Sequence, residues 1–386
     1  MSLRVLFVTE LRPCPPNGGE KIHCYNVLNS LSRCFDVTVL APPPPADCPL
    51  TRQVRYWQPL PDVGQSFGQR LRQSPTVIVP RPAWRRLLVD LCRQVQPAVV
   101  WFSYGHWGHY ARLAQAAGAK TIMRTHNVQS ALAWQGLTSR SVTRWHLYYA
   151  VRTPLETLHE RLLFRRFDRV LSVTEADRRY HARWVGDNKS LWVPNYIDES
   201  RYQGAEPVQR DPNLVIMTGN FGAFQNQQGA IWLAEAIWPQ VQQARPSARL
   251  LLVGHAPGNF RRAIEGHPNI RCTGTVPAVT PYLRQAALGV VPLRHGSGMR
   301  IKILEALATE LPLVSTSVGA EGIDLRHSEH ALLADQAEEF AQAVTHLLNN
   351  ATKRRQLAQN GLTLLRREYG FAVNSERLRQ IVEDVR

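Results

Sequence analysis

Short apolar runs alternate with helical segments in two successive series along this chain of 386 residues, which limits the folds it can adopt. The first series places such runs at residues 4–10, 36–41, 97–103, 119–126 and 168–174. The second places them at residues 213–219, 248–254, 269–276, 288–294 and 311–316. Strand-like runs separated by helices are typical of parallel sheets that helices cover on both faces. The sequence therefore predicts an α/β protein with two doubly wound, Rossmann-like domains.

Polar segments indicate where the domains end. Residues 200–213 are polar and contain glycine and proline, so we expect them to link the two series. We predict an N-terminal domain over residues 1–200 and a C-terminal domain over residues 201–370. A C-terminal helix over residues 371–386 is expected to pack back toward the N-terminal domain. Two such domains facing each other would leave a cleft at the carboxyl ends of their strands, where ligands bind in these folds.

The formal net charge of +16 is unevenly distributed. Residues 1–200 hold 26 Lys and Arg against 14 Asp and Glu. A basic half can attract nucleic acid, an anionic membrane or a negatively charged substrate, or can simply favour solubility. Segments 66–88 and 140–183 combine arginines with aromatic residues, which suits an anionic bilayer surface and equally suits a solvated arginine-rich face. No recognisable nucleic-acid motif is present, so we expect no nucleic-acid partner.

Other features bear on the location of the protein. No run of about 18 apolar residues occurs, which argues against a membrane-spanning helix. The N-terminal segment MSLRVLFVTE is interrupted by charge and patterned as a strand rather than as a signal peptide. The six cysteines lack the spacing of a CxxC pair or a zinc site, and we expect them to be reduced thiols. These features predict a cytoplasmic protein, attached at most peripherally to the inner face of the membrane.

The segment GSGMRIKILEA, which begins at Gly296, carries the most specific chemistry. Small residues follow a strand there, and a helix is expected to begin near Met299. The unpaired N–H groups at such a helix start suit a phosphate. Arg300 and Lys302 are expected in the first turn, where they oppose the helix dipole unless an anion lies between. A diphosphate fits this arrangement, because arginine binds phosphate bidentately and lysine adds a point charge.

Glu305 follows Lys302 by three positions and allows two interpretations. The two residues could form a surface ion pair at i, i+3. Alternatively, the carboxylate could accept two hydrogen bonds from a vicinal diol such as that of a ribose. The residue pattern alone does not separate these interpretations.

This segment, with VSTSVGAEGI at residues 314–323, resembles the donor-binding core of the group 1, or family four, retaining glycosyltransferases of the GT-B type. That family carries two glutamates separated by seven residues. Glu305 matches the second glutamate, whereas Ser297 replaces the first, which usually contacts the transferred sugar in the family. A sub-group written GSGxRxKILEA has the same replacement, and this chain resembles it over nearly its full length. The resemblance implies that Arg300 and Lys302 hold the donor diphosphate and that Glu305 holds the ribose.

The same resemblance implies further donor contacts. Gly222 would let the backbone approach the phosphates, and the backbone of Thr275 and Val276 would touch the nucleobase. Glu321 is a weaker candidate, since a carboxylate at a helix start explains it equally well. The full set of candidate donor-binding residues is Gly18, Gly19, Gly222, Thr275, Val276, Ser297, Gly298, Arg300, Lys302, Glu305 and Glu321.

In the first half, Gly18 and Gly19 directly follow the first strand. They form either a plain strand–helix turn or, as the family suggests, a loop over the donor phosphates or the acceptor. His126 ends a predicted strand, and the family has a histidine there that contacts the transferred sugar. Glu175 and Asp177 resemble the family's "s-x-x-d" segment, for which helix capping is the favoured explanation.

These observations predict a retaining hexosyltransferase-type glycosyltransferase. It would move a sugar from a nucleotide-sugar, with UDP the first expectation and GDP the next, to a hydroxyl of a glycan, a lipid-linked glycan or a glycolipid. The candidate catalytic residues are His126, Arg300, Lys302 and Glu305. No Asp-x-Asp or histidine cluster occurs, so we expect no metal or other cofactor, and cations with a helix N-terminus would stabilise the diphosphate. The alternatives are a non-catalytic GT-B subunit that binds a partner or glycan, and a sugar-nucleotide epimerase.

Overall fold

The chain divides into two compact units. Unit 1 comprises Met1–Pro194 and Asn374–Arg386, and unit 2 comprises Asn195–Val373. The computed structural model describes residues 2–16, 18–61, 82–103, 105–125, 128, 153–154, 157–158, 160–204, 208–267, 269–296 and 298–386.

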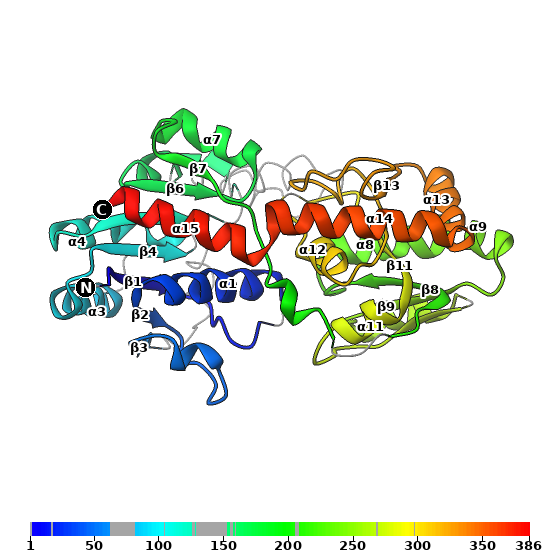
Figure 1. Cartoon of the computed structure of the whole chain (residues 1–386), viewed down its shortest axis with the longest axis horizontal. Coiled ribbons are helices and arrows are strands. Elements are labelled where there is room, and N and C mark those ends of the chain that lie inside the picture. Colours follow the sequence, from blue (N-terminus) through cyan, green and yellow to red (C-terminus); the bar gives the residue numbers. More distant parts are fainter. Residues whose placement is uncertain are drawn as a thin grey trace. The chain divides into compact units, whose positions relative to one another are not determined.

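Unit 1 contains a parallel sheet of seven strands in the order β3-β2-β1-β4-β5-β6-β7 (Figure 1). The strands are β1 (Arg4–Thr9), β2 (Asp36–Ala41), β3 (Tyr56–Pro59), β4 (Val99–Ser103), β5 (Lys120–Arg124), β6 (Arg169–Ser172) and β7 (Ser190–Trp192). Every residue of β4 is buried, as expected for a central strand with helices on both faces. The strand order reverses at β1, which pairs with β2 on one side and β4 on the other.

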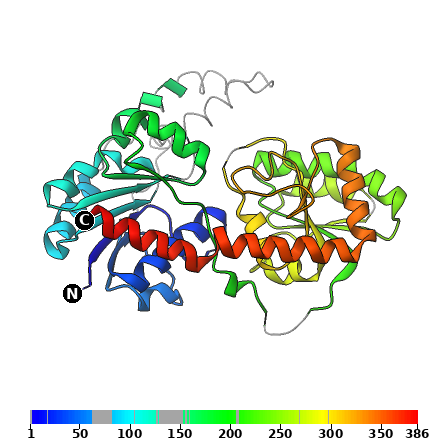
Figure 2. The same cartoon turned by 45° about the horizontal axis from the view of Figure 1, so that its top comes forward.

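Helices cover both faces of this sheet. The described helices are α1 (Gly19–Cys34), α3 (Pro82–Val95), α4 (Ala111–Ala116) and α7 (Glu175–Val185), with the short turns η1 (Pro49–Arg52) and η2 (Gly105–His109). Trp84 of α3 stacks on Trp107 with ring centroids 5.1 Å apart, in a core that includes Leu6 and Val8 of β1. On α1, the hydroxyl of Ser30 lies 2.7 Å from that of Ser375 in α15 (Phe371–Val385). The two helices therefore run alongside each other (Figures 1 and 2).

Unit 2 contains a second parallel sheet, in the order β10-β9-β8-β11-β12-β13. Its strands are β8 (Asp211–Thr218), β9 (Arg249–Val253), β10 (Ile270–Cys272), β11 (Ala286–Val291), β12 (Leu313–Ser315) and β13 (Leu332–Leu333). Its helices are α8 (Phe224–Trp232), α9 (Trp238–Ala244), α10 (Gly258–Glu265), α11 (Thr280–Gln285), α12 (Ile301–Ala308), α13 (Ala337–Asn349) and α14 (Ala351–Leu364), with π-helical turns η4 (Leu233–Ile237) and η5 (Leu365–Tyr369). The predicted fold class, doubly wound parallel α/β domains, is confirmed in both units.

The segment that opens unit 2 is anchored to the residues that close the same unit. Ile197 donates its N–H to the carbonyl of Tyr369 at 3.1 Å, and the Glu199 carboxylate accepts from the N–H of Phe371 at 3.2 Å. The short turn η3 (Glu199–Arg201) follows. The linker expected over residues 200–213 therefore begins as ordered structure.

The expectation of six free thiols is wrong for Cys14 and Cys48, which form a disulfide with a Cα–Cα distance of 5.9 Å. Cys14 lies in the loop after β1, and Cys48 lies in the loop after β2. Because β1 and β2 are neighbouring parallel strands, their carboxyl ends meet at one edge and bring these two loops together. The remaining thiols are Cys24, Cys34, Cys92 and Cys272. The cysteine pattern therefore no longer supports a reducing compartment.

Candidate functional site

The candidate site lies where the strand order of unit 2 reverses. β8 pairs with β9 on one side and with β11 on the other, so the loops after β8 and β11 leave the same sheet edge in opposite directions. Doubly wound sheets bind ligands at this switch point. Here Lys302 Nζ donates to Asn226 Oδ1 at 2.8 Å, which joins the helix after β11 to the helix after β8. Asn226 in turn donates to the carbonyl of Asn220 at 3.0 Å.

Glycines let the backbone of neighbouring loops approach closely at this edge. Gly254, after β9, has φ of 133°, and a Cβ atom there would lie 2.0 Å from the carbonyl oxygen of Gly219. A Cβ on Gly229 of α8 would lie 2.8 Å from the carbonyl oxygen of Pro292, after β11. No other residue fits at these positions without displacing backbone, so the edge is built from main chain that presents N–H and C=O groups.

The loop GSGMR reaches its helix later than expected. Gly296 and Gly298 have φ of 106° and 82°, which favour glycine. Helix α12 begins at Ile301, and Arg300 is its N-cap without a side-chain cap hydrogen bond. The prediction of two cations inside the first turn is therefore wrong for Arg300, although Lys302 lies there. Ser297 lies outside the described residues.

Arg300 lies back against the loop that precedes it. A Cβ atom on Gly296 would lie 2.8 Å from Nη2 of Arg300, so the guanidinium lies over the glycine turn. Burial lowers the pKa of Arg300, and the charge of Glu321 opposes that effect. Glu321 lies in an exposed turn and not at a helix start, which removes the alternative explanation considered for it.

Lys302 and Glu305 do not form the surface ion pair that their spacing allows. Lys302 is bonded to Asn226, and Glu305 Oε1 accepts from the Tyr202 hydroxyl at 3.2 Å. Burial and, to a smaller extent, the Arg300 charge lower the pKa of Lys302 to about 7, against the opposing charge of Glu305. Burial raises the pKa of Glu305 to about 7, against the Tyr202 hydrogen bond and the Lys302 charge. The site thus holds a half-buried amine and a buried carboxyl group one helical turn apart.

The other candidates of unit 2 lie at the same sheet edge. Gly222 is exposed in the loop after β8, where its N–H donates to Asn220 Oδ1 at 2.9 Å. Thr275 and Val276 follow β10, next to the bridge that pairs Gly274 with Gly254. The structure therefore brings the loops after β8, β9, β10 and β11 to one edge.

In unit 1, Gly18 and Gly19 precede and begin α1 at the carboxyl end of β1. His126 lies outside the described residues, but β5 ends just before it in a buried arginine. Arg124 donates to His23 Nε2 at 2.9 Å and to the carbonyl of Pro194 at 3.0 Å. This guanidinium links α1 to Pro194, where the first segment of unit 1 ends.

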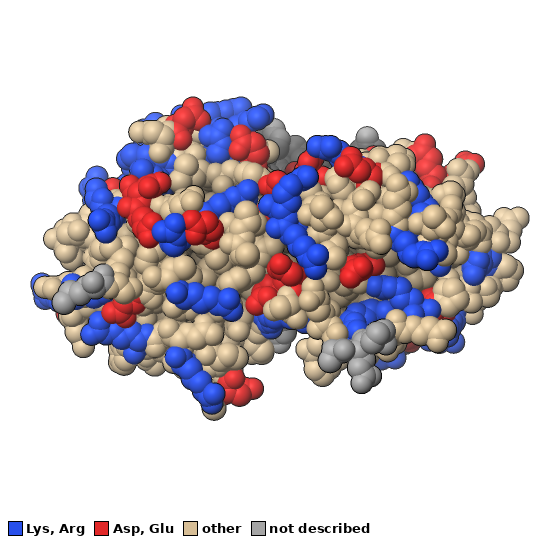
Figure 3. Space-filling view, in the orientation of Figure 1, with Lys and Arg blue, Asp and Glu red and all other residues tan. Residues whose placement is uncertain are grey.

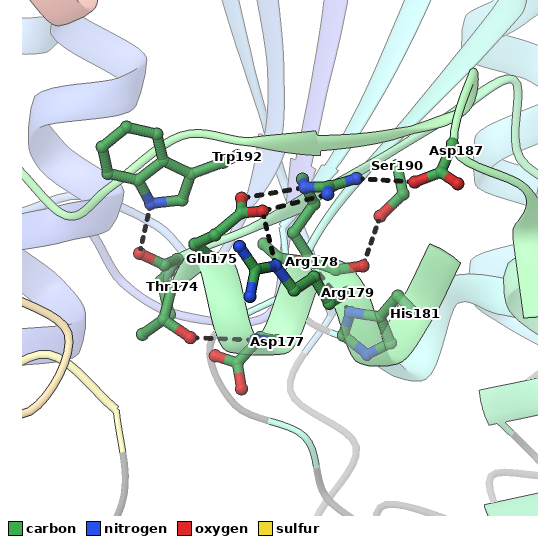
Figure 4. Close-up of polar contacts among 11 residues, drawn as sticks. Thr174, Glu175, Asp177, Arg178, Arg179, His181, Asp187, Ser190 and Trp192 are labelled. Atoms are coloured by element: carbon green, nitrogen blue, oxygen red, sulfur yellow. Dashed lines mark hydrogen bonds and ion pairs between the residues drawn. The ribbon is translucent and has the colours of Figure 1, made fainter. Parts of the chain in front are cut away.

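The start of α7 is a capping arrangement rather than a reaction site (Figure 4). Thr174 Oγ1 accepts from the N–H of Asp177 at 3.0 Å. The backbone of Thr174 in turn donates to the Asp177 carboxylate, as in a capping box. Glu175 accepts from Arg178 at 2.8 Å and from Arg179 at 3.1 Å. Capping and local ion pairs therefore account for both acidic residues that the sequence pattern singled out.

Several residues at the site were not found from the sequence. Asn226 of α8 and the loop residues Gly219 and Gly254 are brought together only by the sheet order, and Tyr202 lies in the segment expected to be a linker. Asn226 had one sequence signal, because it follows Gly222, the residue expected near the phosphates, by four positions. Among the residues that the structure describes, no group of three or more His, Cys, Asp or Glu could hold a metal ion.

The fold and this switch-point site define a doubly wound α/β protein with two parallel sheets. Within that class, residues 17–201 match the family described as "Glycosyltransferase Family 4", and residues 212–350 match "Glycosyl transferases group 1". The two halves of the chain therefore carry the two domains of these glycosyltransferase families.

Individual relatives are distant. Over 244 residues the chain is 25% identical to the phosphatidyl-myo-inositol mannosyltransferase of Mycobacterium tuberculosis. The match covers 60% of this chain and 62% of the relative. The chain spans between 46% and 62% of the length of the curated relatives it matches.

Solved structures support the fold over nearly the whole chain. The sucrose-phosphate synthase of Thermosynechococcus elongatus superposes with a TM-score of 0.77 at 17% identity, covering 99% of this chain and 98% of that one. Anabaena Alr3699/HepE in complex with UDP and glucose superposes with a TM-score of 0.70 at 13% identity, covering 99% and 100%. Both likenesses place the chain in the GT-B fold.

We predict that Gly254→Ala destabilises unit 2, because the new Cβ would strain a positive φ and meet the Gly219 carbonyl. The free energy of unfolding should fall by about 2–4 kcal/mol, seen as a lower melting temperature in calorimetry. Gly258→Ala is the matched control, since nothing lies within 4 Å of its added Cβ. That variant should change stability by less than about 1 kcal/mol. Equal effects of the two substitutions would contradict the close approach of the loops.

Proposed function

We propose that this protein is a glycosyltransferase that moves a sugar from a UDP-sugar to an acceptor hydroxyl with retention of configuration. The observation that carries the proposal is the Lys302–Asn226 contact, which assembles a cationic helix start and a buried carboxylate at the switch point of unit 2. The match to two glycosyltransferase families supports the reaction class. The UDP complex of Anabaena Alr3699/HepE, a structure of the same fold, supports uracil as the base.

In this proposal the diphosphate binds at the start of α12. Arg300 and Lys302 pair with its oxygens, and the backbone at Gly222 and Gly298 approaches them. The N–H groups that open α12 add hydrogen bonds and the favourable end of the helix dipole. Ser297 would lie beside the transferred sugar, where related enzymes carry a glutamate.

The remaining contacts fix the nucleoside and the sugar. Glu305 accepts hydrogen bonds from the ribose diol, while the backbone of Thr275 and Val276 contacts the base. Glu321 remains a weaker donor-site candidate, held near Arg300. His126, two positions after the last residue of β5 in sequence, would contact the transferred hexose, and Gly18 with Gly19 would form the loop over the phosphates or acceptor.

The transfer breaks the bond between the anomeric carbon and the diphosphate oxygen, and forms a bond from that carbon to the acceptor oxygen on the same face. The acceptor proton passes to the departing phosphate oxygen, so UDP leaves with that proton and with the electron pair of the broken bond. Arg300, Lys302 and the helix start stabilise the negative charge that develops on the diphosphate. UDP release that requires an acceptor separates transfer from epimerisation, and UDP binding without turnover would indicate a non-catalytic subunit.

Donor binding is tested by Lys302→Met. UDP should raise the melting temperature of the wild type, because a ligand at about 100 times its Kd stabilises by about 2.7 kcal/mol. Loss of one charge-assisted contact should weaken UDP binding by about 10- to 100-fold and leave uridine, which has no phosphate, unaffected. Lys353→Met is the control, since Lys353 donates to the Ser328 carbonyl instead. No shift with any nucleoside diphosphate would overturn the donor site.

We also predict that UDP binding takes up a proton at pH 8. Burial lowers the pKa of Lys302 to about 7, so its amine is partly neutral at that pH. A bound diphosphate favours the charged ammonium and raises this pKa, whereas Glu305 is already ionised at pH 8. Titration calorimetry in buffers of different ionisation enthalpy should show the uptake, and Lys302→Met should abolish it. Proton release at pH 8 would contradict the assignment.

For the acceptor, we propose a lipid-linked glycan or glycolipid presented at an anionic membrane face. One of the relatives is named for phosphatidyl-myo-inositol, a lipid acceptor. No helix among the described residues is long and apolar enough to cross a membrane. Arg85 and Arg86 are exposed on α3, whereas the neighbouring Trp84 is buried in the core. The two arginines would therefore bind the membrane surface without the tryptophan. Elsewhere, Lys and Arg are interspersed with acidic residues on the face shown in Figure 3.

Co-sedimentation tests this attachment. The wild type should bind vesicles of phosphatidylcholine with phosphatidylglycerol at low salt, and bind pure phosphatidylcholine weakly. Arg85→Glu with Arg86→Glu should reduce binding by about tenfold or more, because each basic residue contributes about 1 kcal/mol at an anionic surface. Arg366→Glu with Arg367→Glu, exposed in unit 2, is the charge-matched control. If the wild type does not bind anionic vesicles at low salt, the proposed membrane attachment is wrong.

A further inference from the structure

Tyr202 lies outside every motif that indicates the donor site, yet it contacts the residue proposed to bind the ribose. It follows η3, and its hydroxyl donates to Glu305 Oε1 at 3.2 Å across 103 positions of sequence. Each of the two residues is only 9% exposed. Within the described part of the chain, no other residue hydrogen-bonds the Glu305 carboxylate. This contact therefore sets the orientation of that carboxylate.

The segment that carries Tyr202 is itself held in place. The Glu199 carboxylate accepts from the N–H of Phe371, the first residue of α15, which anchors η3 two residues before the end of unit 2. Two residues after Tyr202, a Cβ atom on Gly204 would lie 1.5 Å from Nη1 of Arg284, so the chain packs directly on that guanidinium. The backbone is therefore held in place on both sides of Tyr202 in sequence.

A carboxylate that binds a vicinal diol must keep its plane fixed, because both hydroxyls have to reach it at once. Each carboxylate oxygen can accept more than one hydrogen bond, so Oε1 can serve Tyr202 and one hydroxyl while Oε2 serves the other. Donation from a phenol also favours the ionised carboxylate, which burial disfavours. Burial raises the pKa of Tyr202 well above its usual range, so its hydroxyl keeps its proton and remains a donor.

We infer that Tyr202 is a positioning residue that orients Glu305 for the ribose diol and thereby sets the preference for ribonucleotides over nucleotides that lack the diol. The inference rests on the proposed function, since it presumes that a nucleotide donor binds at α12. It assigns a role in donor selection to the segment that opens unit 2.

Calorimetric titration with UDP and with 2′,3′-dideoxyuridine diphosphate tests this role. The wild type should prefer UDP, and Tyr202→Phe should weaken UDP binding by about tenfold, because an ordered charge-assisted hydrogen bond is lost. Binding of the dideoxy nucleotide should change by less than about twofold. The ratio of the two affinities does not depend on the folded fraction of a variant, so a destabilised protein still yields a clear result.

Two further variants separate positioning from general support. Tyr369→Phe removes another buried tyrosine hydroxyl of unit 2, which accepts from the Asp324 N–H at 3.0 Å. This control should lower the melting temperature without changing the ratio. In a Glu305→Ala background, Tyr202→Phe should add nothing, because the residue through which it acts is absent.

The outcomes are distinct. If the wild type binds no nucleoside diphosphate, the proposed function fails, and this inference fails with it. If Glu305→Ala abolishes the preference for UDP while Tyr202→Phe keeps it, the donor site stands and the role of Tyr202 is overturned. Equal weakening of both nucleotides by Tyr202→Phe would also overturn it, since that result indicates a structural effect.

Discussion

The reversal of strand order at β8 is the constraint on which the rest of the site depends. β8 starts the second domain, and the chain adds strands first on one side and later on the other. The loops after β8 and β11 therefore diverge from adjacent strands and leave room for a ligand between them. The Lys302–Asn226 hydrogen bond spans this point and ties α12 to α8. Without the reversal, the two helices would lie apart and no cationic helix start would face the glycine loops.

The electrostatics of the site follow from this packing. Lys302 and Glu305 lie on one helix, one turn apart, but the fold turns each toward a neutral partner, Asn226 and Tyr202. Each charged form loses solvation without gaining an opposite charge at ion-pair distance, which is why burial shifts both pKa values toward neutrality. The diphosphate and ribose diol proposed to bind here would supply an opposite charge to Lys302 and hydrogen-bond donors to Glu305.

Much of the fold could be predicted from the sequence because most strands are buried on both faces and appear as continuous apolar runs. β3 was not predicted, since it is an edge strand whose Tyr56 and Pro59 ends are exposed. The start of α12 was placed near Met299, whereas it begins at Ile301, because glycine geometry delays the helix. The Cys14–Cys48 pairing could not be read from spacing, because sheet order and not sequence separation brings the cysteines together.

By itself the sequence determined the two parallel α/β domains and the chemistry of the segment from Gly296 to Ala306, because apolar periodicity, glycines and neighbouring cations are local properties. Only the tertiary structure decided the partners of that segment. Asn226, Gly254 and Tyr202 are all distant in sequence, and a hydrogen bond or a backbone approach between such residues depends on strand order and on the packing of loops at one sheet edge. Residue order alone leaves that arrangement open.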